Sequence, residues 1–377
     1  MCWKKSIAGM VIACLCLLVM GTVMVTLPVT AASSQIQKKQ FKPRKHITKK
    51  ERDQYYSNSA FLGNSISKGL KIYFSSSGKG VCGHPVMLVQ GCYSFYNDKK
   101  QGSPYQIAYR GRRMRAKEAI AASGVKRAFI NMGSNDLWKP SAQSYRDYVH
   151  YICEIRKWNP RVVIFVQGTT PMCSSRNRKY LNNSAIRDLN HRMKKFCSRQ
   201  KDIYYVDISK DLKTAEGGLQ RKYSSDGYVH MTMKGYRIWT DNLNAYVSKL
   251  LLQEKNAKAA VKQAARSKSI EDYQAARKRV NHLDSSTVKQ KLQSRLKRIK
   301  KKVKKSNQYS TGRKVTPEAS KTPQESLRSE ERKASQESVA PEESKVPQES
   351  MVPEESKVPQ ESMTPEENKV SRESMIL

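Results

Sequence analysis

Three short segments of the chain carry residue types that together could activate a serine hydroxyl. In the first, residues 61–66, an apolar run ends in Gly-Asn-Ser and the chain turns towards a helix. Open α/β folds place their functional groups at the carboxyl ends of the strands, so Ser65 could attack an acyl carbon there. Because a serine after a strand is more often a helix cap, this segment predicts chemistry only together with the other two.

The second segment, residues 131–136, reads Asn-Met-Gly-Ser-Asn-Asp and directly follows a strand-length apolar run. Gly133 permits a tight turn, and the turn can present the side-chain N–H₂ of Asn135 above the same sheet edge. A donor in that position stabilises the oxyanion of a tetrahedral intermediate. Taken alone, Asn135 is equally well interpreted as an ordinary turn residue.

The third segment, residues 223–230, places Asp226 and His230 before the last helical stretch of the α/β region. His230 would take the proton from Ser65 as general base, and Asp226 would hold the imidazole in the required tautomer. Elimination supports this choice, because only His84 and His230 lie in loops near a sheet edge. The other four histidines lie in a linker, in a basic hairpin or within helices: His46, His282, His150 and His191.

Five apolar runs of strand length alternate with helical candidates around these segments. The runs are rich in Val, Ile, Phe and Tyr and are short enough for buried parallel strands. This alternation predicts a parallel sheet with helices on both faces. The strand candidates are 60–62, 85–89, 127–131, 162–167 and 203–206, and the helix candidates are 114–123, 142–158, 180–198 and 232–252.

In this order the three segments resemble the SGNH or GDSL hydrolase family. That family's first block is Gly-Asp-Ser, its third is Gly-x-Asn-Asp, and its last carries Asp and His before a C-terminal helix. The likeness covers about residues 58–252. It implies an α/β fold, a flavodoxin-like three-layer sandwich with a five-stranded parallel sheet. It also implies ester or related acyl-transfer chemistry by Ser65, His230 and Asp226, without a metal or an organic cofactor.

Two departures from the family pattern concern the first and last blocks. Asn64 stands where the family has Asp, and three residues separate Asp226 from His230 instead of two. The family's Asp is not a member of the triad, so the first departure leaves the chemistry possible. The longer spacing leaves Asp207, which follows the fifth predicted strand, as the reserve partner of His230.

The resemblance also implies an oxyanion hole built from three blocks. Its donors would be the backbone N–H of Ser65, the Asn135 side chain and a residue of the second block. We predict Gly91 for the second block, because it follows the second strand candidate, with Ser94 as the alternative behind it.

The N-terminus has the features of an export signal. Two lysines precede an apolar run over residues 7–27, and small residues follow it up to Ala32. The run is also long enough to span a bilayer, so residues 1–32 are predicted to be either a cleaved signal peptide or an N-terminal anchor. Either outcome makes the rest of the chain extracellular, secreted or associated with the cell surface.

The net charge of +39 is unevenly distributed along the chain. Residues 255–314 carry 20 Lys or Arg against three acids. Apolar stripes at helical spacing predict a basic helical hairpin over residues 253–306, after the α/β domain of residues 58–252. Such a surface indicates an anionic partner, either a wall polymer of the teichoic type or an anionic membrane surface. No recognised motif indicates nucleic acid.

The remaining segments are predicted to have no core of their own. Residues 33–57 are polar and basic and read as a linker. Residues 307–377 form a disordered tail of Pro/Glu/Ser hexapeptide repeats, in which proline excludes a continuous helix and apolar bulk is too low for folding. The five cysteines after the leader are scattered, which is typical neither of a disulfide framework nor of a zinc site.

The predicted function is that of an extracellular serine esterase or acyl hydrolase, or an O-acyltransferase, acting on an acylated carbohydrate or cell-wall polymer. The alternative from a different class is a catalytically inactive surface binding or adhesin module on the same scaffold. Asn64, the lengthened last block and the high charge favour that alternative. An inactive module would keep its biological effect after Ser65→Ala, whereas an enzyme would lose it.

Overall fold

The computed structural model describes residues 41–76 and 83–311. The predicted signal peptide or anchor lies outside these residues, as do the first part of the predicted linker and the repeat tail from residue 312 onward. Within the described ranges no helix combines the length and the apolar character that a membrane span requires.

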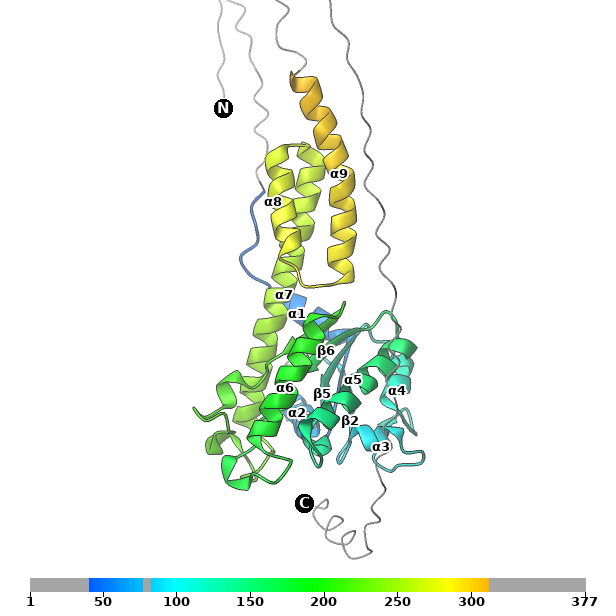
Figure 1. Cartoon of the computed structure of the whole chain (residues 1–377), viewed down its shortest axis with the longest axis vertical. Helices are drawn as coiled ribbons and strands as arrows, with labels where there is room; N and C mark the ends of the chain where they lie inside the picture. Colours follow the sequence, from blue (N-terminus) through cyan, green and yellow to red (C-terminus); the bar gives the residue numbers. More distant parts are fainter. Residues whose placement is uncertain (1–40, 77–82, 312–377) are drawn as a thin grey trace, which may run out of the picture. The chain divides into compact units, whose positions relative to one another are not determined.

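A five-stranded parallel sheet forms the centre of the α/β domain (Figure 1). Its strand order, β2-β1-β5-β6-β7, is that of flavodoxin-like folds, which confirms the predicted fold class. All five strands fall within one residue of the predicted runs, because strands covered on both faces are short and continuously apolar. Their bounds are β1 Ser59–Gly63, β2 Val86–Val89, β5 Arg127–Asn131, β6 Val163–Gln167 and β7 Ile203–Val206.

Helices cover both faces of this sheet, and successive strand residues point alternately into the two layers. One layer packs against α4, α5 and α6, and the other against α1, α2 and α7. The bounds on the first face are α4 Ala116–Ser123, α5 Ser141–Trp158 and α6 Asn183–Ser198, and those on the second are α1 Lys49–Ser57, α2 Ser65–Ser76 and α7 Met233–Ser267.

A row of stacked aromatic rings crosses the sheet on the α7 face. Phe61, Phe129 and Phe165 occupy the same register on neighbouring strands, with ring centroids 4.9 and 4.4 Å apart. Tyr204 continues the row at 5.1 Å from Phe165. A slip of one residue would turn every ring to the opposite face, so the row fixes the register of the strands. It thereby fixes the relative height of the loops that follow them.

Helix α1 occupies the end of the stretch that we predicted as a linker, residues 33–57. Thr48 and Glu51 form a capping box, in which each side chain accepts the backbone N–H of the other. Tyr56 is completely buried against the sheet. The capping signature and one aromatic anchor therefore make these residues part of the α/β domain despite their polar composition.

A small insertion between β2 and β5 was not predicted from the sequence. It contains α3 (Phe95–Lys99) and a two-stranded antiparallel ribbon of β3 (Ile107–Tyr109) and β4 (Arg112–Met114). Arg110 and Gly111 join the two strands with φ of 49° and 75°, the left-handed conformation that tight hairpin turns need. Strands of three residues are too short to give a readable alternation pattern.

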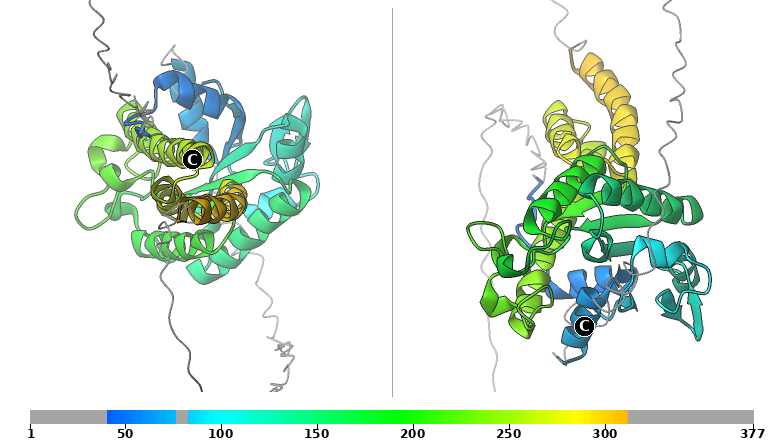
Figure 2. Two further views of the ribbon diagram at one scale, coloured as in Figure 1. Left: turned by 90° about the horizontal axis from the view of Figure 1, so that it is seen from above. Right: turned by 60° about the horizontal axis from the view of Figure 1, so that its bottom comes forward.

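The basic segment forms a helical unit of three helices, where we predicted a hairpin. Helices α8 (Ile270–Asn281) and α9 (Thr287–Thr311) correspond to the two predicted stripes. The third member is the second half of α7, which continues to Ser267 through the predicted domain boundary at residue 252. The three helices lie side by side (Figures 1 and 2) and share one apolar core.

The helical unit is fastened at the amino edge of the sheet, where β7 begins. The Asp202 carboxylate accepts the backbone N–H of Thr287 at 2.9 Å, and the backbone N–H of Asp202 donates to the carbonyl of Ser285 at 3.1 Å. Lys255 of α7 pairs with Glu51 of α1 at 2.9 Å. Because β7 points away from this edge, the unit lies opposite the carboxyl ends of the strands.

Candidate active site

Ser65 begins α2 immediately after β1, at the carboxyl edge of the sheet. The preceding Asn64 is buried, with 1% of its surface exposed. Its Oδ1 accepts the backbone N–H of Ile66 at 3.1 Å, and its Nδ2 donates to Oγ of Ser134 at 2.7 Å. These bonds fix the turn that presents Ser65. The N-terminus of α2 carries a partial positive charge, which favours negative charge developing beside it.

His230 lies in the loop before α7 and faces Ser65. The distance from His230 Nε2 to Ser65 Oγ is 3.0 Å, and that from His230 Nδ1 to Asp226 Oδ2 is 2.6 Å. The tautomer with the proton on Nδ1 donates to the carboxylate and leaves Nε2 free to accept the serine hydroxyl. The structure thus brings together the three residues that the sequence analysis selected, in one line of hydrogen bonds.

The extra residue between Asp226 and His230 is absorbed within the loop. Gly227 adopts a φ of 69°, which glycine tolerates without strain. Asp226 Oδ1 then accepts the backbone N–H of Tyr228 at 2.8 Å and that of His230 at 3.2 Å. The longer spacing therefore leaves the Asp–His contact intact, which removes one of the three arguments for an inactive module.

The carboxylate of Asp226 is held in its charged form. Burial alone would raise its pKa, since two thirds of the side chain is covered. Hydrogen bonds from His230, from the Tyr228 N–H and from the Ser224 hydroxyl outweigh burial and hold the pKa of Asp226 below its ordinary value. An ionised carboxylate at this distance stabilises a protonated imidazole.

Asn135 lies in a short 3₁₀ helix, Ser134–Asp136, that follows β5. Because β1 and β5 pair with Gly63 opposite Asn131, the two loops leave the sheet at the same level. The bond between Asn64 and Ser134 ties the loops together next to the serine and the amide. One N–H of Asn135 donates to the carbonyl of Tyr93 at 3.1 Å, which leaves the second N–H of the amide available.

The second-block candidate Gly91 follows β2, on the other side of β1 from β5. The backbone N–H of Gln90 donates to the carbonyl of Gly63 at 3.1 Å, so this loop starts beside the serine turn. A side chain at Gly91 would meet no heavy atom within 4 Å, which shows open space there. The hydroxyl of Ser94 instead caps α3 by accepting the N–H of Asn97 at 3.1 Å. Gly91 therefore fits the role better than Ser94.

Asp136 has a structural role in the site that the sequence reasoning did not assign. Its Oδ1 accepts the backbone N–H of Phe95 at 2.8 Å, which joins the loop after β5 to the loop after β2. The side chain is almost completely buried, and Oδ2 has no hydrogen-bond partner within the described ranges. Burial raises the pKa of Asp136 to about 7, although the Phe95 N–H and Lys139 act in the opposite direction. The Gly-x-Asn-Asp pattern was the only signal for this residue.

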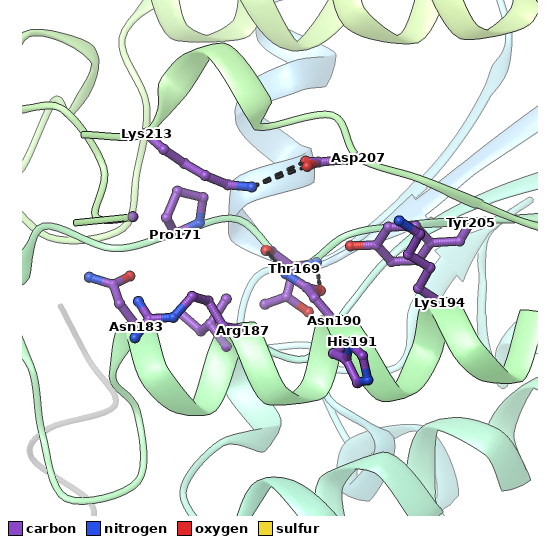
Figure 3. Close-up of a pocket in the computed structure, with 12 residues that line it drawn as sticks. Thr169, Pro171, Asn183, Arg187, Asn190, His191, Lys194, Tyr205, Asp207 and Lys213 are labelled. Atoms are coloured by element: carbon purple, nitrogen blue, oxygen red, sulfur yellow. Dashed lines mark hydrogen bonds and ion pairs between the residues drawn. The ribbon is translucent and has the colours of Figure 1, made fainter. Parts of the chain in front are cut away.

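The reserve candidate Asp207 is engaged elsewhere. Its carboxylate pairs with Lys213 at 3.1 Å and accepts the N–H of Ser209 at 3.0 Å. It lines a separate pocket of about 200 Å³ between α6 and the loops after β6 and β7, where Figure 3 shows it joined to Lys213. Neither there nor elsewhere in residues 41–76 and 83–311 do three or more His, Cys, Asp or Glu side chains gather as a metal site would require.

Comparisons with known proteins identify the family. The sequence profile described as "GDSL-like Lipase/Acylhydrolase family" matches residues 61–238. That range begins inside β1 and ends inside α7, so it contains the serine turn, the Asn135 loop and the His230 loop. A search among curated proteins found no match.

Three of the solved structures similar to this chain are the following. A GDSL-like lipase from Bacteroides thetaiotaomicron is 17% identical with a TM-score of 0.39, covering 52% of this chain and 89% of its own. A carbohydrate esterase of family 3 from Talaromyces cellulolyticus is 15% identical with a TM-score of 0.37, covering 52% and 98%. A lipolytic G-D-S-L protein from Veillonella parvula is 17% identical with a TM-score of 0.34, covering 49% and 94%. On the strength of the profile match, the chain belongs to the GDSL-like lipase/acylhydrolase (SGNH) family and is an esterase or acylhydrolase that acts on ester bonds.

Proposed function

We propose that the protein is an extracellular serine esterase that removes acyl groups from an acylated carbohydrate or cell-wall polymer. The observation that carries the proposal is the continuous line from Ser65 Oγ to His230 Nε2, 3.0 Å, and from His230 Nδ1 to Asp226, 2.6 Å. This is the arrangement that nucleophilic catalysis by serine needs.

The proposed reaction begins with attack by Ser65. Its Oγ forms a bond to the ester carbonyl carbon while His230 takes the hydroxyl proton, and the carbonyl electrons move onto oxygen. When this tetrahedral intermediate collapses, the bond to the alcohol breaks and His230 returns the proton to the departing alkoxide. Asp226 keeps the imidazole oriented and stabilises its charged form throughout.

The second half of the reaction uses the same groups. His230 takes a proton from water, the water oxygen attacks the acyl carbon, and the bond to Ser65 Oγ breaks as the serine regains its proton. A sugar hydroxyl in place of water would give acyl transfer by identical steps. An O-acyltransferase is therefore the second candidate activity of the same site.

Three donors are proposed for the oxyanion: the backbone N–H of Ser65, the free N–H of Asn135 and the backbone N–H of Gly91. They come from the carboxyl ends of β1, β5 and β2, which are neighbours in the sheet. Donors fixed in advance need no reorganisation during the reaction, and a single one typically contributes about 3 kcal/mol. The Asp136–Phe95 bond holds the Asn135 and Gly91 loops at a fixed separation.

Two exposed aromatic side chains favour a carbohydrate substrate. Trp138 is 58% exposed and lies two residues after Asp136, and Tyr96 is 60% exposed and directly follows Phe95, the residue to which Asp136 is bonded. Both rings lie on the segments that follow β5 and β2, as the proposed donors Asn135 and Gly91 do, and we infer that they stack on sugar rings of the substrate. With a third of the His230 side chain exposed as well, the site can receive an acyl group carried on a bulky polymer.

The proposed location and partner rest on the segments outside the catalytic domain. The leader predicted at residues 1–32 would export the chain, and the helical unit would hold the enzyme against an anionic wall polymer or anionic membrane surface. The charge of +39 supports an anionic partner, because it is far above what solubility requires.

The test of the proposed activity combines an assay with a covalent label. The purified protein should hydrolyse p-nitrophenyl acetate and react with a fluorophosphonate probe at Ser65. Ser65→Ala should lower kcat by about 10⁴-fold or more, because the covalent step is lost. Labelling that persists in Ser65→Ala, or undiminished hydrolysis, would contradict the assignment of the nucleophile.

A further inference from the structure

Helix α9 presents a row of cations that the rest of the described chain does not neutralise. Residues 287–304 contain nine Lys or Arg and no acid. None of the ion pairs found in residues 41–76 and 83–311 involves one of these side chains. Some cations elsewhere have acidic partners, as Arg115 has in Asp98 and Glu154. The like charges along this helix repel one another, and a bound anion would relieve that repulsion.

Part of this charge surrounds a groove between the end of α7 and α9. The groove has a volume of about 150 Å³. Three of its cations lie three and four residues apart on α9, which places them on one face of the helix. The fourth faces them from the end of α7. The lining residues are Lys268, Arg295, Arg298 and Lys302, together with Ala265 and Ile299.

Lys268 has a backbone conformation that its residue type does not favour. It ends α7 with φ of 54° and ψ of 19°, and its N–H donates to the carbonyl of Ala264 at 3.2 Å. Glycine or asparagine normally occupies this left-handed position, because the Cβ of other residues is strained there. Strained residues are enriched at binding sites, and Lys268 lines the groove.

We propose that this groove binds a linear phosphodiester polymer with short polyol repeats. Arg295, Arg298 and Lys302 follow one another at rises of about 4.5 and 6 Å along the helix, so successive phosphates of an extended chain can each meet a cation. Ala265, which is exposed, offers apolar contact to the carbon segments between the phosphates. This inference rests on the anionic partner of the proposed function and assigns its binding site to the groove. It does not depend on ester hydrolysis.

The groove fits a polymer better than a membrane or a nucleic acid. The apolar residues of α9 between positions 292 and 303 are buried in the helical unit, so the cationic face over this stretch has no large apolar side chain to insert into lipid. No aromatic ring lines the groove, and single-stranded nucleic acids need such rings for base stacking. Charge complementarity without insertion or stacking is what a polyol phosphate requires.

The groove is an anchor and not an extension of the active site. His230 lies three residues before the start of α7, whereas Lys268 lies directly after its end. A helix of 35 residues is about 52 Å long. A polymer bound in the groove is therefore held about 50 Å from Ser65.

Two full-length variants of identical net charge test the inference. Binding to a synthetic poly(glycerol phosphate) is measured by fluorescence anisotropy at about 0.1 M salt, where surface charges still interact over ~10 Å. The groove variant should bind at least about tenfold more weakly than the wild type. The control variant loses four cations of α9 outside the groove. Its affinity should stay within about threefold of the wild-type affinity. The groove variant carries Lys268→Gln, Arg295→Gln, Arg298→Gln and Lys302→Gln, and the control variant carries Lys297→Gln, Lys300→Gln, Lys301→Gln and Lys304→Gln.

Equal weakening in the two variants would overturn the groove and leave only diffuse attraction. Tighter binding to vesicles of phosphatidylglycerol and phosphatidylcholine, or to oligo(dT), would overturn the choice of ligand. Hydrolysis of p-nitrophenyl acetate should be equal in all three proteins. The wild type could lack esterase activity while the groove variant alone still binds the polymer more weakly. That result would support the groove and contradict the proposed enzyme function.

Lys268→Gly separates binding from folding. Because glycine adopts the left-handed conformation freely, this variant should melt at the same temperature as the wild type or above it. It should nevertheless bind the polymer more weakly. Unchanged affinity in Lys268→Gly would remove Lys268 from the site, and a lower melting temperature would show that its conformation serves the fold.

Discussion

At the carboxyl edge of the sheet the polar side chains of the candidate site have defined partners, whereas the described cations of α9 have no acidic one. Asp226 is held by His230 and by two backbone N–H groups, and Asn135 by the carbonyl of Tyr93. The described side chains of α9 form no ion pair. Chemistry needs groups fixed to within a fraction of an ångström, while attraction to a polyanion needs charge left for the ligand to neutralise.

The strongest test of the fixed site is Asp226→Asn. An amide cannot enforce the tautomer with the proton on Nδ1 of His230, so we expect kcat for an ester to fall by about 10⁴-fold with little change in melting temperature. Steady-state kinetics and a thermal melt measure both. Asp207→Asn is the matched control and should keep most of the activity. Equal losses would return Asp207 to consideration as the partner of His230.

Asn135→Ala tests the next level, the oxyanion donors. Removing one donor should lower kcat by about 10²–10³-fold and leave KM almost unchanged, because the bond strengthens only as the oxyanion forms. The bond to Tyr93 is lost as well, so the melting temperature is measured alongside. A rise in KM with constant kcat would assign Asn135 to ground-state binding instead.

The buried carboxyl of Asp136 predicts a dependence of stability on pH. Its pKa is raised from 3.8 to about 7 in the folded protein, so the folded state binds the extra proton between these values. Stability from this group is therefore fully present below about pH 4 and declines as pH rises towards 7, by up to about 1.4 kcal/mol per pH unit. Of the charged groups near this carboxyl, Lys139 lowers the pKa of Asp136 and Asp147 raises it.

Asp136→Asn has no titrating group at this position and tests that dependence. Urea unfolding of both proteins at pH 5, 6, 7 and 8 should show the free-energy difference shifting in favour of the variant as pH rises. Parallel curves would mean that Asp136 stays ionised over this range and that its carboxylate is stabilised in a way the contacts do not show.

The smallest expected effect concerns salt, and it separates the two regions directly. Raising the salt concentration from 0.1 to 1 M shortens the screening length from ~10 to ~3 Å. Binding of the poly(glycerol phosphate) should fall at least about tenfold, whereas kcat for p-nitrophenyl acetate should change less than about twofold. A salt effect of similar size on catalysis would indicate that the basic surface reaches the active site.

The sheet and the placement of the three site segments followed from the sequence, because each signal is local. Apolar runs of strand length mark the sheet, and the neighbours of Ser65 and Asn135 carry the turn chemistry. The choice of Asp226 over Asp207 could not be made from spacing alone. It depended on Gly227 taking a positive φ, which lets the longer loop close.

Other features were missed because they depend on tertiary contacts. Helix α7 continues past residue 252 on a stripe made mostly of alanines, Ala257, Ala260 and Ala264, which read weakly as apolar until α8 and α9 cover them. The role of Asp136 depends on its burial against the α3 loop, and a sequence pattern does not report burial. The Thr48–Glu51 capping box was readable and was overlooked within a basic segment.

The neutral side chain of Asn64 has a consequence for the kinds of molecule that can approach the serine. Where the family carries a carboxylic acid, this chain carries an amide whose Nδ2 donates to Ser134. A carboxylate there would place a negative charge one residue from the nucleophile and would repel an incoming anion by about 1–3 kcal/mol at ~6–10 Å. Because Asn64 is neutral, it does not repel a negatively charged polymer. The turn beside the nucleophile is therefore compatible with the anionic polymers that the cations of α9 attract.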